Sequence, residues 1–142
     1  MLTYSDVIRN SLNKYEGFIR ELHRISSTVE KEGYCAWSRV HEVKELASKL
    51  GIKKLGIAFC IGLSNEAKAI VKYFEDDGFE VYSVCCKCGG VDKMWIGLSE
   101  DQKLIPGSHE SMCNPLTQAE LLNHVGTELN VVVGLCVGHD AF

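Results

Sequence analysis

The chain has 142 residues, of which 46% are apolar and 24% charged, and its formal net charge is −4. This length suits one domain whose core is large enough to need no disulfides, and the negative charge gives no support for nucleic acid as a partner. The apolar runs are too short to span a bilayer, and the N-terminus lacks the pattern of a secretory signal. We therefore expect a cytoplasmic protein with no membrane partner.

The N-terminal third reads as helical. Apolar residues recur at steps of three and four through residues 5–31, which predicts one long amphipathic helix. A second helix is predicted over residues 38–50, where Gly51 supplies a stop signal. We expect residues 1–50 to form a helical segment packed on the rest of a single domain that spans residues 1–142.

Strands and helices alternate after this segment. Short apolar runs near residues 53–59, 79–85 and 129–135 predict buried strands. Helical patterns lie between them, and one of these begins with Asn114 as cap and Pro115 in the first position. This order predicts an α/β fold with three layers: a mainly parallel sheet, helices on both faces, and an N-terminal helical pair.

Seven cysteines are the most unusual feature of the composition. Their odd number, in a chain without an export signal, argues against a disulfide framework. Most of them follow predicted strands or precede a predicted helix: Cys60, Cys85, Cys86, Cys113 and Cys136. Ligands bind at the carboxyl edge of open α/β sheets, so we expect these thiols to meet there. Cys35 lies between the two N-terminal helices and is interpreted as structural.

Such a group of thiols predicts a metal site assembled from several loops. Thiolates suit both iron–sulfur clusters and zinc. The segment Cys85–Cys88 contains one Cys-x-x-Cys pair, so Cys88 or Cys85 is an alternative ligand to Cys86. Glycines next to the cysteines allow the backbone to approach a bound group, and a lysine or a helix start stabilises thiolates. The predicted contacts of that group are Gly62, Lys87, Gly89, Asn114 and Gly138.

A histidine and an acid follow the last cysteine. His139 and Asp140 stand three and four residues after Cys136, at the end of a predicted strand. Such a pair can transfer protons, so we identify both as candidate catalytic residues. The alternative is an exposed loop histidine without a role in chemistry.

Four segments together give the chain a family resemblance: "GIAFCIGL", "SVCCKCGG", "MCNPLTQAELLN" and "GLCVGHD". They resemble a prokaryotic cysteine-rich family, domain of unknown function 1847, from about Glu30 to the C-terminus. Members of that family are described as metal-binding proteins. The resemblance implies that the family's cysteines correspond to Cys60, Cys86, Cys113 and Cys136.

The leading hypothesis is therefore a cysteine-rich metal-binding protein that carries an Fe–S cluster at the carboxyl edge of the sheet. Its role would be electron transfer, sensing, or Lewis-acid chemistry on a small substrate. Two alternatives stay open: a structural zinc protein, and a metal-free thiol-redox or sulfur-transfer enzyme. The expected partners are a small molecule or a redox protein. Relatives that resemble this chain extend past it, and an open sheet edge also suggests a homodimer.

Overall fold

A computed structural model describes residues 2–140 of the chain. The chain divides after Ile52 into a helical unit and an α/β unit, each compact by itself. The helical unit contains α1 (Tyr4–Leu12), α2 (Gly17–Gly33) and α3 (Arg39–Lys49). The expectation of a single domain, with residues 1–50 packed on the remainder, stays a prediction.

The predicted long helix is interrupted between α1 and α2. The backbone N–H groups of Lys14, Tyr15 and Glu16 donate to carbonyls only two or three residues earlier, at 3.0, 3.1 and 2.9 Å. Gly17 then has a φ of +49°, in the left-handed region that favours glycine. The apolar spacing continues across this turn, which is why periodicity alone predicts one helix there.

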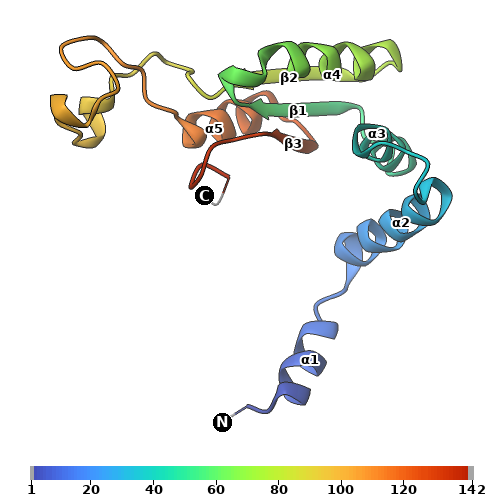
Figure 1. Cartoon of the computed structure of the whole chain (residues 1–142). Coiled ribbons are helices and arrows are strands. Elements are labelled where there is room, and N and C mark those ends of the chain that lie inside the picture. The colour runs from blue at the N-terminus through green and yellow to red at the C-terminus, as the bar shows by residue number, and fades with distance from the viewer. Residues whose placement is uncertain (1, 141–142) are drawn as a thin grey trace. The chain divides into compact units, whose positions relative to one another are not determined.

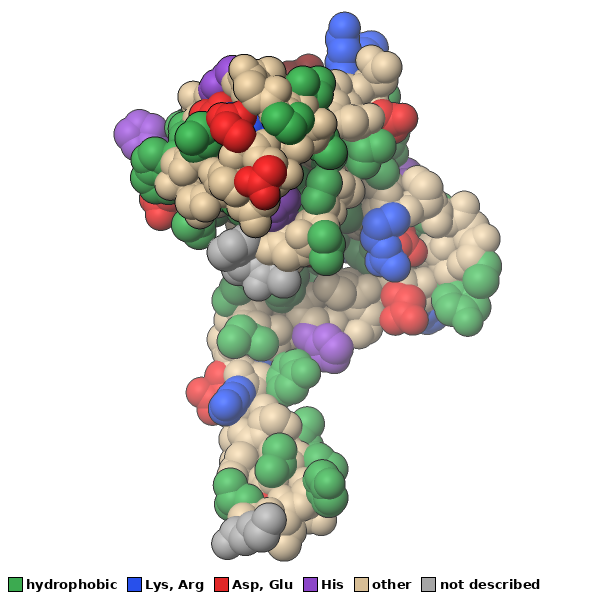
Figure 2. Space-filling view, turned by 60° about the vertical axis from the view of Figure 1, so that its left-hand side comes forward, with side chains coloured by type: hydrophobic (Ala, Val, Ile, Leu, Met, Phe, Trp, Pro, Cys, Tyr) green, Lys and Arg blue, Asp and Glu red, His purple; other side chains and the backbone are tan. Residues whose placement is uncertain are grey.

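Helix α1 is amphipathic, but none of its residues is buried. Large apolar side chains are exposed along it and at the start of α2: Tyr4, Val7, Ile8, Leu12, Phe18 and Ile19. Figure 2 shows hydrophobic side chains, in green, at the surface. A helix of nine residues is marginal in water without packing. The predicted homodimer stays a prediction.

The α/β unit is built on a three-stranded parallel sheet with the order β2-β1-β3. Its strands are β1 (Lys54–Phe59), β2 (Glu80–Cys85) and β3 (Leu129–Val133). Helix α4 (Ser64–Asp76) connects β1 to β2, and α5 (Pro115–Val125) precedes β3. Figure 1 shows α4 and α5 on opposite sides of the strands. The predicted α/β fold is confirmed.

The central strand β1 carries most of the core. Leu55 and Ile57 are fully buried, as is Phe74 of α4. On the other face, a Cβ added at Gly56 would lie 3.1 Å from Cδ1 of Leu122, so the absence of a side chain lets α5 approach closely. The register pairs Phe59 with both Cys85 and Val133, so all three strands end at the same level.

Gln118 of α5 is buried at this carboxyl edge, with 1% of its surface exposed. Its Nε2 donates to the carbonyl oxygens of Val84 and Phe59, at 2.7 and 3.2 Å. Phe59 is the last residue of β1, and Val84 is the last but one of the neighbouring strand β2. This amide therefore ties α5 to the two strand ends that lead into the cysteine segments.

The short 3₁₀ helix η1 (Ile61–Leu63) links β1 to α4, and two more, η2 (Lys93–Ile96) and η3 (Glu100–Gln102), lie between β2 and α5. Residues 92–111 form a loop, called here the charged loop, whose two ends pair through an antiparallel bridge between Asp92 and Ser111. Met112 N–H also donates to the carbonyl oxygen of Val91 at 2.7 Å.

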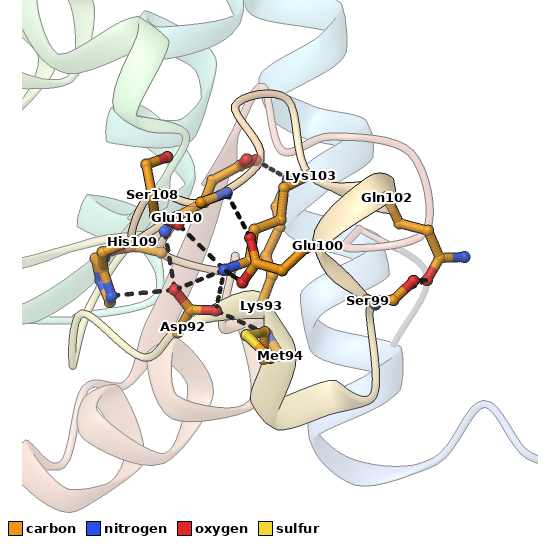
Figure 3. A network of polar contacts seen from close by, with 12 residues as sticks. Asp92, Lys93, Met94, Ser99, Glu100, Gln102, Lys103, Ser108, His109 and Glu110 are labelled. Atoms are coloured by element: carbon orange, nitrogen blue, oxygen red, sulfur yellow. Dashed lines mark hydrogen bonds and ion pairs between the residues drawn. The ribbon is translucent and has the colours of Figure 1, made fainter.

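A buried lysine organises the charged loop (Figure 3). The Lys103 side chain is 2% exposed, and its Nζ lies 2.9 Å from a Glu100 oxygen and 3.1 Å from Asp92 Oδ1. Asp92 also accepts backbone N–H bonds from Met94 and Glu110, both at 2.9 Å. These backbone hydrogen bonds, followed by the nearby Lys103, lower the pKa of Asp92 well below its usual range. A buried cation is tolerated here because several acceptors surround it.

No helix within residues 2–140 is long and apolar enough to cross a membrane.

Truncation of Leu122 tests the contact between α5 and the sheet. We expect Leu122→Ala to lower the free energy of unfolding by about 2–5 kcal/mol, because the side chain is 2% exposed and its loss leaves a cavity. Leu121→Ala, at the neighbouring 42% exposed position, should cost less than about 1 kcal/mol. Denaturant unfolding followed by circular dichroism measures both, and equal losses would contradict this packing.

Asp92→Asn tests the charged loop through its pH dependence. Because folding lowers the pKa of Asp92, its ionised form stabilises the fold above its unfolded pKa of about 3.9, and this stabilisation is lost as pH falls. The variant should therefore lower Tm at pH 7 more than at pH 3.

Asp76→Asn is the control, since Asp76 is 62% exposed and pairs only with Lys72 at 2.8 Å among the described residues. A loss of Tm for Asp92→Asn that is the same at both pH values would argue against an ionic role.

Candidate functional site: a cluster of cysteines

Cysteines continue the strands beyond the carboxyl edge of the sheet. Cys60 N–H donates to the carbonyl oxygen of Val133 at 3.1 Å, and Cys86 N–H donates to that of Phe59 at 2.8 Å. The carbonyl oxygen of Cys86 then accepts the N–H of Asn114 at 2.8 Å, which fixes the start of α5 beside it. The parallel ladder thus extends by one residue and positions thiols from distant parts of the sequence.

The structure brings four thiols together as two pairs. The Sγ atoms of Cys60 and Cys136 are 4.0 Å apart. The Cys113 thiol donates to Sγ of Cys86 at 3.9 Å. The two pairs adjoin, because Cys60 also hydrogen-bonds Cys86 and the charge of Cys113 acts on Cys136. Three of the four follow strands, and Cys113 precedes α5.

The four thiols differ in their electrostatic surroundings. The N–H of Gly62 lowers the pKa of Cys60, and the neighbouring thiols and the charge of Lys87 act in the same direction. Burial raises the pKa of Cys86 to about 12, although the Ile61 N–H donates to its sulfur at 3.4 Å. The hydrogen bond to Cys60 raises the pKa of Cys136, so the proton of that pair favours Cys136.

The remaining cysteines make other contacts. The Cys88 thiol donates to the carbonyl oxygen of Asn114 at 3.7 Å, and burial raises its pKa. Sγ of Cys85 accepts the N–H of Lys87 at 3.5 Å. Cys35 belongs to the helical unit, where it is exposed and has a φ of +56°. Their positions favour Cys86, among the three cysteines of the 85–88 segment, as the member of the cluster.

Some of the residues predicted to contact a bound group lie at the cysteine cluster, and others lie around it. Gly62 lies against Cys60, because a Cβ added there would be 3.8 Å from the Cys60 sulfur. Lys87 holds its Nζ 2.6 Å from the carbonyl oxygen of Ser111. Gly89 and Gly138 have φ angles of +82° and +79°, so they serve sharp turns next to the cysteines.

Asn114 caps α5 as predicted, since its Oδ1 accepts the N–H of Thr117 at 3.2 Å. His139 follows a turn in which its N–H donates to the Cys136 carbonyl at 2.9 Å, and its ring lines a cavity that also includes Cys113. Asp140 is exposed. Only His139 of the predicted catalytic pair lines that cavity.

Within residues 2–140, no three His, Cys, Asp or Glu side chains are arranged so that they could hold a metal ion without moving. The donors are present in pairs rather than as a finished coordination sphere. The fit of a metal therefore depends on the chemistry and spacing of these pairs.

Two features of the site have no clear signal in the sequence. Gln118 reads as a residue that could be solvated, yet it is buried and binds two strand ends. The charged loop carries one wall of the cavity, but residues 94–109 have no helical or strand period. The glutamine has one clue: it occupies the fourth position of α5, one turn from its cap.

Comparison with known proteins places these residues in a family. A relative from Methanocaldococcus jannaschii, described as an uncharacterized protein, is 47% identical over 120 residues, which cover 84% of this chain and 60% of that protein. The chain thus spans less than two thirds of the relative's length. No solved structure matched the chain. The model of a family described as "Protein of unknown function (DUF1847)" matches residues 1–142, so the resemblance inferred from Glu30 onward is confirmed and extends over the whole chain. The chain belongs to the DUF1847 family.

Proposed function

We propose that this protein binds a thiolate-ligated metal centre, an iron–sulfur cluster, through Cys60, Cys86, Cys113 and Cys136. The single observation that carries the proposal is the arrangement of these thiols as two adjoining pairs, with sulfur separations of 4.0 and 3.9 Å. Cys60, Cys86 and Cys113 lie next to strand ends or to the start of α5, and Cys136 lies in the turn after β3. Bound there, such a cluster would supply one-electron redox chemistry.

The sulfur separations suit two thiolates on one metal ion. Two ligands at about 2.3 Å from a tetrahedral centre lie about 3.8 Å apart. Each pair, 60 with 136 and 86 with 113, is within about 0.2 Å of that spacing, so small side-chain rotations would suffice. Two pairs suit a cluster of two irons, each of which takes two thiolates.

The backbone around the pairs favours thiolates. The N–H groups of Ile61 and Gly62 donate to the sulfurs of Cys86 and Cys60. Such bonds stabilise the anionic ligand and tune the potential of a cluster. Lys87 adds a positive charge, which offsets part of the charge of four thiolates. Burial of Cys86 opposes its ionisation in the free protein, and a bound cation would remove that obstacle.

Zinc is the second candidate because four thiolates on one ion need the same spacing within each pair. The two candidates differ in how the pairs relate. A single zinc ion requires all four sulfurs to be equally close, whereas a two-iron cluster separates the pairs by its bridging sulfides. The metal and sulfide content therefore distinguishes the two candidates.

Metal and sulfide analysis of anaerobically purified protein tests the proposal. We expect about two iron and two sulfide per chain, with visible absorbance that is lost on oxidation. Zinc without sulfide would favour the structural zinc site. Protein that takes up neither metal after anaerobic reconstitution, while its thiols remain reactive, would contradict both candidates and favour metal-free thiol chemistry.

Serine variants test the ligand set. Cys60→Ser and Cys113→Ser, one from each pair, should each lose most of the bound metal, since serine is a poor ligand for these metals. Cys85→Ser and Cys35→Ser are matched controls, because neither thiol lies in the pairs, and both should retain the wild-type metal content. Loss of metal in Cys85→Ser but not in Cys113→Ser would show that the ligands are wrongly chosen.

A further inference from the structure

A cavity of about 590 Å³ adjoins the cysteine cluster. Its walls come from the charged loop, from the segment that leads into α5, and from the C-terminal turn that carries His139. Sites for small molecules have volumes of about 300–1,000 Å³, so this one is of ordinary size for a ligand. A cavity of about 150 Å³ accepts benzene, so there is room here for a body of two rings.

The cavity wall is mainly apolar, and much of it is exposed. The apolar side chains that line it are Val91, Trp95, Ile96, Met112, Pro115 and Leu116. Trp95 is 77% exposed and Leu116 is 62% exposed. Large apolar side chains that are grouped around one hollow, rather than scattered, indicate a binding surface. A ligand with an apolar body would remove this surface from water.

One residue of the wall, His139, has a polar atom without a partner. Nδ1 of His139 is buried, yet no hydrogen-bond partner for it exists among the described residues. A buried ring nitrogen left unpaired costs free energy, so a rotation of the ring that turns Nδ1 toward the cavity, where a ligand can pair with it, would be favourable. In the tautomer with a proton on Nδ1, the histidine donates, and the ligand group that satisfies it is an acceptor.

The charges near the cavity favour an acidic acceptor. None of the ten lining residues is Lys, Arg, Asp or Glu, so no carboxylate of the wall repels an anion. The lining also includes the first residues of α5, from Asn114 to Thr117. The N-terminal turn of an 11-residue helix carries partial positive charge. His139 and this turn together would hold one negative group at the edge of an apolar cavity.

We infer that this cavity binds a small monocarboxylic acid with an apolar body of one or two rings. The ring body packs against Trp95 and Leu116, and the carboxylate accepts a hydrogen bond from His139 at the start of α5. Bound in this way, the acid lies beside Cys113 and so at the edge of the cysteine cluster. The inference goes beyond the proposed metal centre and does not require it.

Titration calorimetry with 2-naphthoate, on the full chain with and without added metal, tests the inference. We expect saturable binding of one molecule per chain in both preparations. The amide of the same acid keeps the ring body but not the charge, and it should bind at least about tenfold more weakly. Equal affinity for the acid and the amide would refute the requirement for a carboxylate. Absence of saturable binding would refute the binding site itself.

Two matched pairs of variants locate the binding. Leu116→Glu places a carboxylate at the cavity and should weaken naphthoate binding at least about tenfold, whereas Leu121→Glu, exposed on the same helix outside the cavity, should not. His139→Ala should weaken binding about threefold to tenfold, and His124→Ala, in the last turn of α5, should have no effect. Circular dichroism shows whether each variant is folded. If the control variants weaken naphthoate binding as much as the cavity variants do, naphthoate does not bind in this cavity.

The metal content is measured separately, so this test and that of the metal centre can fail independently. Naphthoate binding in protein that takes up no metal would leave the inference standing and refute only the proposed cluster.

Discussion

The site depends on a buried amide that joins one helix to two strand ends. Nε2 of Gln118 donates to the carbonyl oxygens of Phe59 and Val84, and these residues directly precede the segments that carry Cys60 and Cys86. Helix α5 thus cannot move along the sheet without breaking two buried hydrogen bonds, each of which would leave a polar group unpaired. Because Cys113 directly precedes Asn114, the cap of this helix, the amide also sets the distance of Cys113 from the strands.

The four clustered thiols differ in how exposed they are, and therefore in what each contributes to the site. Cys86 is 2% exposed and its pKa is raised, whereas Cys136 is exposed and follows the last strand. A buried ligand gives a site rigidity, because packing restricts its rotamers. An exposed one gives a metal or a reagent a route of entry. One pair contains the buried thiol and the other contains the exposed thiol, so the cluster has a fixed side and an open side.

Most of the α/β unit could be predicted from the sequence because local and long-range signals agree there. The apolar runs that end before Cys60 and Cys86 form β1 and β2, and the cap and proline at Asn114 and Pro115 begin α5. The same topology accounts for the meeting of distant cysteines. Prediction from the sequence fails in residues 5–31, because one continuous apolar spacing there spans two separate helices. It also fails in the charged loop, which is held by a bridge between its two ends and has no helical or strand periodicity.

The charged loop connects the stability of the fold to the shape of the cavity. Its two ends meet at the bridge between Asp92 and Ser111, and Lys103 holds its interior through Asp92 and Glu100. Trp95 follows Asp92 by three residues within the turn that this carboxylate caps. The ionic contacts therefore position an apolar wall without entering the cavity themselves. This separation lets charge determine the geometry of the loop, while the cavity stays apolar enough to favour a ligand that carries a single polar group.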